Sequence, residues 1–259
     1  MVSENRPSKP VMSQSELRHH QKHGLCYVAD LGVTGIPDAE NLMTAARELR
    51  LQGEIPDLLL FLAHPPTVAV GLRDRFTERP VDLLVEPERL EREGIALTRS
   101  VRGGGITYHW PGQVVCYPVL ALAEGERDVS GYMWRLEQVG MDTLAQFGVS
   151  VSRRKGKAAY VGLWVDECKV ISMGVRISKW VTSFGFAINL EGDHAPSSYV
   201  RPCGIEGASL ATLEEILGHA PPRSRVMEAV KESFTSVFSR TVEPVPGDLL
   251  DKITSDLSG

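Results

Sequence analysis

Short apolar runs alternate with longer amphipathic stretches along this chain, a pattern that predicts strands interspersed with helices. The apolar runs have the length of strands and are bounded by glycine, proline or polar residues. The short bend at 64–66, His-Pro-Pro, separates two of them, so these two strands are expected to be neighbours. The expected strands cover residues 25–31, 57–62, 67–71, 114–120, 159–165, 168–178 and 181–190.

Three amphipathic stretches predict the main helices. The first covers residues 38–52. The second is expected to start with Ser130 as its N-cap and to end at Gly148. A capping box of Thr212 and Glu215 precedes the last helix. The inward-facing residues of that last helix are Val226, Val230, Phe234 and Val237.

Short connections between the strands favour an α/β fold, in which a mixed, mostly antiparallel sheet is flanked by helices. A chain of 259 residues with 42% hydrophobic content is long enough to bury the core of a single domain. We expect this domain to cover residues 25–240. We expect two tails to flank it. The N-terminal tail, at 1–24, is polar and flexible because it has too little apolar surface to order itself, and the C-terminal tail is at 241–259.

Composition and charge narrow the range of functions. A net charge of −5 argues against the broad basic surface that nucleic-acid binding requires, so no nucleic-acid partner is expected. No apolar run approaches the roughly 18 residues needed to span a bilayer, so no membrane association is expected either. The four cysteines, at 26, 116, 168 and 203, lack CxxC spacing. We therefore expect a cytoplasmic protein without a metal or another cofactor.

The stretch from Arg102 to Gln113 carries most of the candidate chemistry. Four glycines within it allow backbone N–H groups to approach a ligand closely, and Arg102, Thr107, His109 and Gln113 offer hydrogen-bonding side chains. The spacing matches neither phosphate-binding glycine motif. The composition alone fits a loop that grips a polar ligand and an ordinary tight turn about equally well.

Three motifs together resemble the octanoyltransferases of lipoate biosynthesis, also called lipoate-protein ligase B. They are the arginine-glycine stretch just described, a lysine strand at 167–176, and Arg201-Pro202-Cys203-Gly204-Ile205. They occur in the order and spacing of that family and cover about residues 25 to 218. The resemblance implies the biotin and lipoate protein ligase-like fold. It also implies transfer of an octanoyl group from octanoyl-acyl carrier protein, through a cysteine thioester, to a lysine of lipoyl carrier domains such as the H protein and the 2-oxoacid dehydrogenase subunits.

The same resemblance assigns the site residues. Cys203 corresponds to the nucleophile and Lys169 to the residue that activates it. The residues that correspond to the substrate-binding segments are Arg102, Gly103, Gly104, Gly105, Ile106, Thr107, Tyr108, His109, Ser172, Met173, Gly174, Gly185, Phe186 and Ala187.

The residues themselves support a reactive Cys203. Pro202 and Gly204 place it in a loop, whereas the other cysteines lie within strand patterns, and the nearby Arg201 favours its thiolate. Strand alternation places Lys169 on the face that Ile171 occupies, where desolvation favours the neutral amine and a neighbouring thiolate favours the ammonium. A lysine at a strand start that reaches solvent remains the alternative.

Two positions depart from the family pattern, and one segment is unusually basic. Trp110 and Phe184 stand where the family usually has glycine and often has histidine. One hypothesis is that these two aromatic side chains pack together as a remodelled pocket wall.

The basic run at 153–157, together with arginines at 73, 75 and 79, is either a docking patch for an acidic carrier protein or a solvated surface.

Three other functions remain open from the sequence. An ATP-dependent lipoate ligase on the same fold would form an adenylate and would not need Cys203, although the Pro111-Gly112-Gln113 ending argues against it. A lipoyl amidotransferase would take its group from another carrier protein. A non-catalytic binder of lipoylated domains is supported only by the two aromatic departures.

Overall fold

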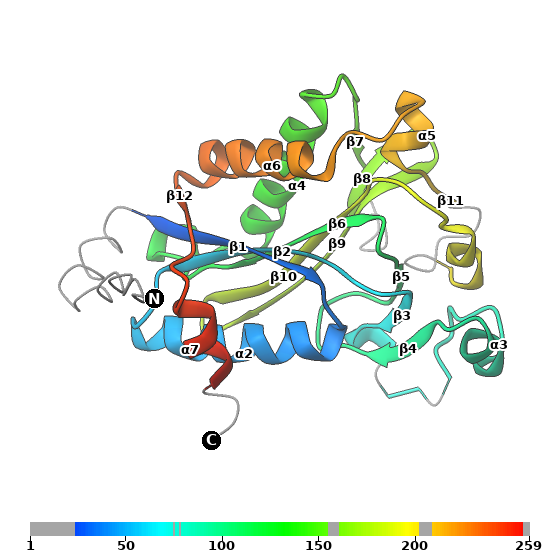
Figure 1. Cartoon of the computed structure of the whole chain (residues 1–259), viewed down its shortest axis with the longest axis horizontal. Coiled ribbons are helices and arrows are strands. Elements are labelled where there is room, and N and C mark those ends of the chain that lie inside the picture. Colours follow the sequence, from blue (N-terminus) through cyan, green and yellow to red (C-terminus); the bar gives the residue numbers. More distant parts are fainter. Residues whose placement is uncertain (1–23, 75, 78, 155–160, 202–208, 256–259) are drawn as a thin grey trace, which may run out of the picture.

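In the computed structural model, which describes residues 24–74, 76–77, 79–154, 161–201 and 209–255, a nine-stranded sheet runs through the centre of the protein (Figure 1). Its strand order is β12-β1-β2-β6-β10-β9-β8-β7, with β11 beside β9. The pairs β12–β1, β1–β2 and β11–β9 are parallel and the others antiparallel, which confirms the predicted mixed, mostly antiparallel sheet. Its strands are β1 (Leu25–Val33), β2 (Asp57–Ala63), β6 (Gln113–Val119), β7 (Ser152–Arg153), β8 (Gly162–Val165), β9 (Cys168–Ser178), β10 (Val181–Asn189), β11 (Ser209–Leu210) and β12 (Thr241–Pro244).

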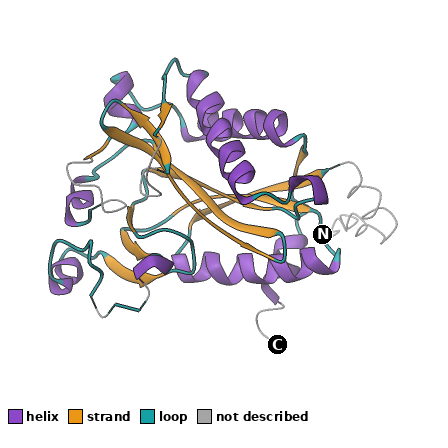
Figure 2. Cartoon of the chain, turned by 180° about the vertical axis from the view of Figure 1, so that it is seen from behind, coloured by secondary structure: helices purple, strands orange, loops and turns teal. Residues whose placement is uncertain are grey.

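Helices cover both faces of this sheet (Figure 2). The long helices α4 (Val129–Ala145) and α6 (Arg223–Phe238) lie on one face, and α2 (Ile36–Gln52) with α7 (Leu249–Ser255) lies on the other (Figure 1). Each face therefore has its own apolar core. Within the described residues, no helix is both long and apolar enough to cross a bilayer.

A second, smaller sheet stands at one end of the large one, and it corrects the predicted pairing of two strands. In it, β3 (Thr67–Val70) pairs with β4 (Ala96–Arg99) and β5 (Ile106–His109), with the helix α3 (Pro87–Arg92) nearby. The strands before and after the bend at 64–66 were expected to be neighbours, yet β2 and β3 lie in different sheets. Two consecutive prolines without N–H donors turn the chain out of the first sheet.

The segment after residue 240 belongs to the folded unit, which differs from the predicted C-terminal tail. Strand β12 pairs in parallel with β1, and Ile253 of α7 is fully buried in the core on the α2 face. The sequence signal was weak because a four-residue strand and a seven-residue helix are too short to show periodicity. The predicted N-terminal tail lies outside the described residues except for Gly24.

The helix termini agree only in part with the sequence prediction. Asp128, rather than Ser130, caps α4, because its carboxylate accepts a hydrogen bond from the Ser130 N–H. The predicted capping box is confirmed: Thr212 and Glu215 bond each other's backbone N–H at the start of α5 (Leu213–Leu217).

Candidate active site

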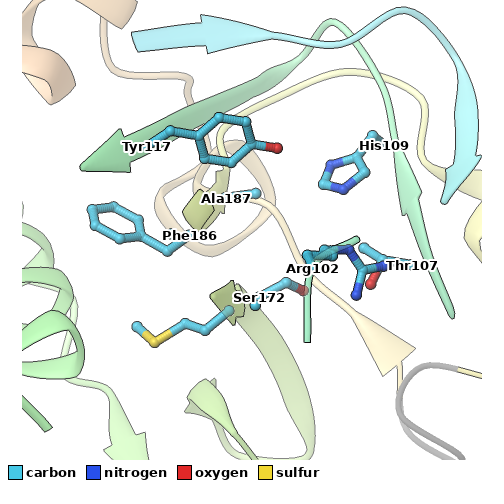
Figure 3. Close-up of a pocket in the computed structure, with 10 residues that line it drawn as sticks. Arg102, Thr107, His109, Tyr117, Ser172, Phe186 and Ala187 are labelled. Atoms are coloured by element: carbon cyan, nitrogen blue, oxygen red, sulfur yellow. The ribbon is translucent and has the colours of Figure 1, made fainter. Parts of the chain in front are cut away.

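A pocket lies where β9 and β10 of the large sheet face the glycine-rich stretch and β5 (Figure 3). Its empty volume is about 290 Å³, a figure that includes space open to solvent. Nine predicted substrate-binding residues line it, joined by Tyr117, which the sequence did not indicate. The lining residues are Arg102, Thr107, His109, Tyr117, Ser172, Met173, Gly174, Gly185, Phe186 and Ala187.

The pocket has a polar side and an apolar side. Figure 3 shows Arg102, Thr107 and His109 together on one side and Phe186 on the other, with the Tyr117 hydroxyl directed toward the His109 side. Arg102, Thr107 and His109 come from the glycine-rich stretch, and the apolar side chains come from β9 and β10. A ligand with an apolar chain and a polar group is therefore the chemical class that fits.

The glycines between Arg102 and Ile106 serve close backbone packing. Gly103 donates to the Val175 carbonyl, and a Cβ on Gly103 would lie 2.9 Å from that oxygen. Gly104 has φ +88°, which glycine adopts without strain. The carbonyls of 102, 104 and 105 accept bonds from the N–H groups of 71–73. These glycines therefore position Arg102. Two other predicted substrate-binding residues do not line the pocket: Ile106 and Tyr108 are buried in the core of the small sheet.

Arg102 is held in a fixed orientation despite its charge. Its guanidinium donates to the Ala69 carbonyl at 2.9 Å and to the Gly103 carbonyl at 3.1 Å, and only 8% of the residue is exposed. Bonds to two carbonyls compensate part of the cost of burying the charge. The guanidinium thus places a fixed positive charge at the polar side of the pocket.

Two buried histidines belong to this region: His109, which lines the pocket, and His64, whose ring centroid lies 5.1 Å from that of His109. His64 uses Nδ1 to donate to the Thr34 carbonyl, so its Nε2 accepts from the Tyr117 hydroxyl at 2.8 Å. Burial lowers the pKa of His64 from 6.5 to about 4. Burial also holds the pKa of His109 well below its usual range, with His64 and Arg102 acting in the same direction. Both rings are therefore neutral at pH 7.

Lys169 is buried, but on the opposite face of the strand from the predicted one. The β8–β9 register shifts between Leu163 and Trp164, so Val170 is an extra residue in a β-bulge. Val170 and Ile171 both face the α4 core, and the Lys169 side chain instead crosses over Gly162 toward the Ser172 face. A one-residue insertion reverses the face that alternation predicts.

The surroundings of Lys169 leave it 1% exposed. Its Nζ atom lies over the Trp164 ring, 5.1 Å from the ring centroid. A Cβ on Gly162 would lie 2.9 Å from the lysine Cε and would overlap the Ile171 carbonyl. Glycine at 162 therefore leaves the space that the lysine side chain occupies.

Cys203 lies outside the described residues, within the gap at 202–208, but both ends of that gap are anchored. Before it, the Arg201 N–H donates to the Asp82 carbonyl at 2.8 Å. After it, Ser209 and Leu210 form β11 beside Cys168 and Lys169. The described chain therefore resumes, six residues after Cys203, on the large sheet beside the lysine.

Trp110 and Phe184 do not pack together, which corrects the hypothesis of a shared pocket wall. Trp110 stacks on Tyr108 in the core of the small sheet and donates to the Glu191 carbonyl. Phe184 lies in the α2-side core with its ring against Tyr117. Neither residue lines the pocket.

The described arginines of the basic run make contacts within the protein. Arg153 bonds Glu137 and lies over the Trp134 ring, and Arg154 bonds Glu167 and lies over the Trp164 ring. These contacts attach the end of β7 to α4 and the residue that follows it to the β8–β9 connection. Residues 155–157 lie outside the described part of the chain.

Tyr117 and His64 are the pocket-side residues that the sequence analysis missed. Tyr117 sits in a strand that is buried along its whole length, where a tyrosine resembles an ordinary core aromatic. His64 sits in a proline bend that indicated only a turn. A polar group inside or directly after an apolar run is the signal that could have indicated both. Among the described residues, no group of three or more His, Cys, Asp or Glu side chains is arranged to hold a metal ion.

Sequence comparisons agree with this geometry. The model of the lipoyl protein ligase A/B catalytic domain matches residues 38–235. An octanoyltransferase from Solibacter usitatus is 36% identical, with 86% of this chain and 96% of the relative covered. One from Caldicellulosiruptor saccharolyticus is 31% identical, with 90% and 95% covered. The chain belongs to the octanoyltransferase family. Its members are acyltransferases, and the enzyme class predicted from the sequence is confirmed.

Solved structures confirm the predicted biotin and lipoate protein ligase-like fold of this octanoyltransferase family member. A bipartite lipoate protein ligase from Thermoplasma acidophilum superimposes with a TM-score of 0.66 at 17% identity, with 91% of this chain and 92% of that one covered. The biotin protein ligase of Aquifex aeolicus in complex with biotin and ATP gives 0.52 at 15% identity, with 82% and 70% covered. At these identities, the likeness concerns the fold alone.

Proposed function

We propose that this protein transfers an octanoyl group from octanoyl-acyl carrier protein to a lysine of lipoyl carrier domains, through a thioester on Cys203. The observation that carries the proposal is Lys169, a fully buried lysine on the pocket-side face of β9. The chain that contains Cys203 returns as β11 directly beside it. The proposal places the enzyme in the cytoplasm, in keeping with cysteines that lack disulfide spacing.

In the first half-reaction, the Lys169 amine accepts the proton of the Cys203 thiol, and the thiolate attacks the thioester carbonyl of the donor. A bond forms between the cysteine sulfur and the acyl carbon. The bond from that carbon to the carrier's sulfur then breaks. The departing thiolate takes the proton back from the Lys169 ammonium, so the lysine ends the step neutral.

In the second half-reaction, the amine of the acceptor lysine attacks the same carbonyl carbon. Lys169 accepts a proton from the attacking nitrogen, the bond to the Cys203 sulfur breaks, and the cysteine thiolate recovers that proton. An amide on the acceptor and a free cysteine remain. One base therefore serves both halves, because each transfers one proton between a nucleophile and a leaving sulfur.

The pocket supports an acyl chain as the transferred group. Its apolar side, with Met173, Phe186 and Ala187, suits the methylene chain, and Gly174 and Gly185 leave room beside the strands. The unbranched Met173 side chain adapts to chains of different length.

Mass spectrometry of an apo lipoyl domain tests the proposal. With octanoyl-acyl carrier protein and no ATP, one octanoyl group should be added to the domain, and octanoic acid with ATP should add none. Modification that requires ATP and free acid would instead identify a lipoate ligase. Faster transfer from an octanoylated carrier domain than from acyl carrier protein would identify an amidotransferase. Binding of the domain without transfer would identify a non-catalytic binder.

A further inference from the structure

Asn189 is the last residue of β10. This strand lies between β9, which carries Lys169, and β6, which follows His109 in the chain. It is fully buried, and in the sheet register it lies opposite Gln113 of β6. Its side-chain nitrogen lies 3.1 Å from the Lys169 carbonyl oxygen and 3.2 Å from that of Ala211. Carbonyl oxygens only accept, so both N–H bonds of the amide are used and its orientation is fixed.

The first consequence concerns the chain that follows β11. This strand has only two residues, and the Ala211 N–H that follows it donates to the same Lys169 carbonyl at 3.2 Å. The Asn189 amide joins the carbonyls of Lys169 and Ala211 through one rigid group. It therefore sets the spacing between the lysine and the chain that returns from residues 202–208.

The second consequence concerns His109. With its nitrogen used, Asn189 presents Oδ1, which accepts from Gln113 Nε2 at 3.0 Å. Gln113 then presents Oε1 to His109 Nδ1 at 2.8 Å, so Nδ1 carries the proton. Because burial keeps the ring neutral, Nε2 has a free lone pair. The tautomer of a pocket-lining histidine is thus set by a chain of bonds that starts at the Lys169 carbonyl.

We propose that Asn189 is a positioning residue for acyl transfer, which holds Lys169 in register with β11 and sets the His109 tautomer through Gln113. The inference rests on the proposed function for its link to Lys169. Asparagine is required because its short side chain brings two N–H donors to the carbonyls of Lys169 and Ala211 and one acceptor to Gln113. Alanine offers neither, and an ionised aspartate has no donor.

Three variants separate positioning from ordinary stability. Asn189→Ala loses every bond, and Asn189→Asp keeps the acceptor for Gln113. Thr182→Val is the matched control, because Thr182 is equally buried on β10 and its hydroxyl bonds two backbone groups of the 118–120 segment, far along the strand. All three are expected to lower stability toward urea. Only the Asn189 variants should slow single-turnover octanoylation, by about 10²-fold if Lys169 shifts by roughly 1 Å.

Two further readouts do not depend on stability. ¹⁵N NMR of native protein should show His109 protonated at Nδ1, and Asn189→Ala should yield mixed tautomers. The rate of Asn189→Asp should fall as pH rises, because the protonated acid can donate to one carbonyl whereas the carboxylate repels both. Equal slowing in Thr182→Val, or native octanoylation rates in both Asn189 variants, would overturn the inference. An absent acyl-enzyme on native protein would reject the proposed function, while the tautomer measurement would still decide the second role of Asn189.

Discussion

His64 is a buried base, and its protonation is coupled to folding. Its hydrogen bonds to described residues go to Thr34 and Tyr117, and burial lowers its pKa from 6.5 to about 4. The unfolded chain therefore binds a proton at a higher pH than the folded protein does. By linkage, its contribution to stability is complete above pH 6.5 and is lost as pH falls toward 4, up to about 3 kcal/mol in total.

The prediction is measured with His64→Gln, which keeps a neutral polar side chain but does not titrate in this range. Urea unfolding at several pH values should give a free energy of unfolding that falls more steeply below pH 6.5 in native protein than in the variant. His109 also titrates in the variant, and burial, the main cause of its low pKa, is unchanged there, so most of the difference in slope belongs to His64. Parallel pH curves would contradict the assignment.

Gly162 gives a second prediction at this scale, because its missing side chain makes room for Lys169. Gly162→Ala forces a Cβ against the Ile171 carbonyl and the Lys169 Cε at a residue with φ +128°. We expect more than the ~1–2 kcal/mol cost of a positive φ, together with slower acylation. Gly148→Ala is the control, since its φ is +75° but no atom lies within 4 Å. Gly148→Ala should lower stability but leave the acylation rate unchanged. A native acylation rate in Gly162→Ala would contradict the packing argument.

At the scale of elements, β12 and α7 attach the C-terminal segment to the sheet at β1 and to the helix α2. Strand β12 covers the edge of β1, and Ile253 of α7 is fully buried. A chain that ends at 240 loses both. Because removal of one such aliphatic side chain costs roughly 2–5 kcal/mol, its melting temperature should drop by at least roughly 5 °C. A chain that ends at 255 serves as the control, and equal melting temperatures for the two would show that 241–255 contributes nothing.

Much of the fold could be predicted from the sequence because hydrophobic residues recur with a clear helical or strand period in most elements. The predicted positions of α2, α4 and α6 and of the central strands agree with the structure. The partners of β3 were not accessible, because strand pairing depends on contacts between distant residues. The face of Lys169 was predicted wrongly because a bulge adds a residue without any change in the pattern of residue types.

The candidate site shows the same limit. Arg102, Thr107 and His109 were found because polar residues among glycines are unusual, and the pocket includes all three. Tyr117 was missed because its polar atom extends from a residue that packs like its apolar neighbours. The roles of Asn189 and Gln113 depend on one cross-strand pair, which only the register reveals.

Across the whole molecule, one buried carboxylate joins segments from both halves of the chain. Asp57 of β2 accepts from Arg50 at the end of α2, from the Ala121 N–H, and from Arg240 just before β12. It is 3% exposed. Asp57→Asn leaves two largely buried arginines without this charge, so the free energy of unfolding should fall by about 3–5 kcal/mol.

Chemical denaturation measures this loss, with Glu93→Gln as the control. Glu93 pairs with Arg89 on the surface, where solvent screens the pair and its contribution to stability is small. If Asp57→Asn and Glu93→Gln had the same free energy of unfolding, the Asp57 network would contribute no more than a surface ion pair.

The central claim is that the chain forms an octanoyl thioester on Cys203 with the help of Lys169. Intact-mass measurement after brief incubation with octanoyl-acyl carrier protein, without ATP or acceptor, tests it most directly. The account predicts the mass of one octanoyl group on native protein, none on Cys203→Ala, and slow formation on Lys169→Ala. An unmodified native protein that is shown to be folded, or a Cys203→Ala variant that still gains the group, would contradict it.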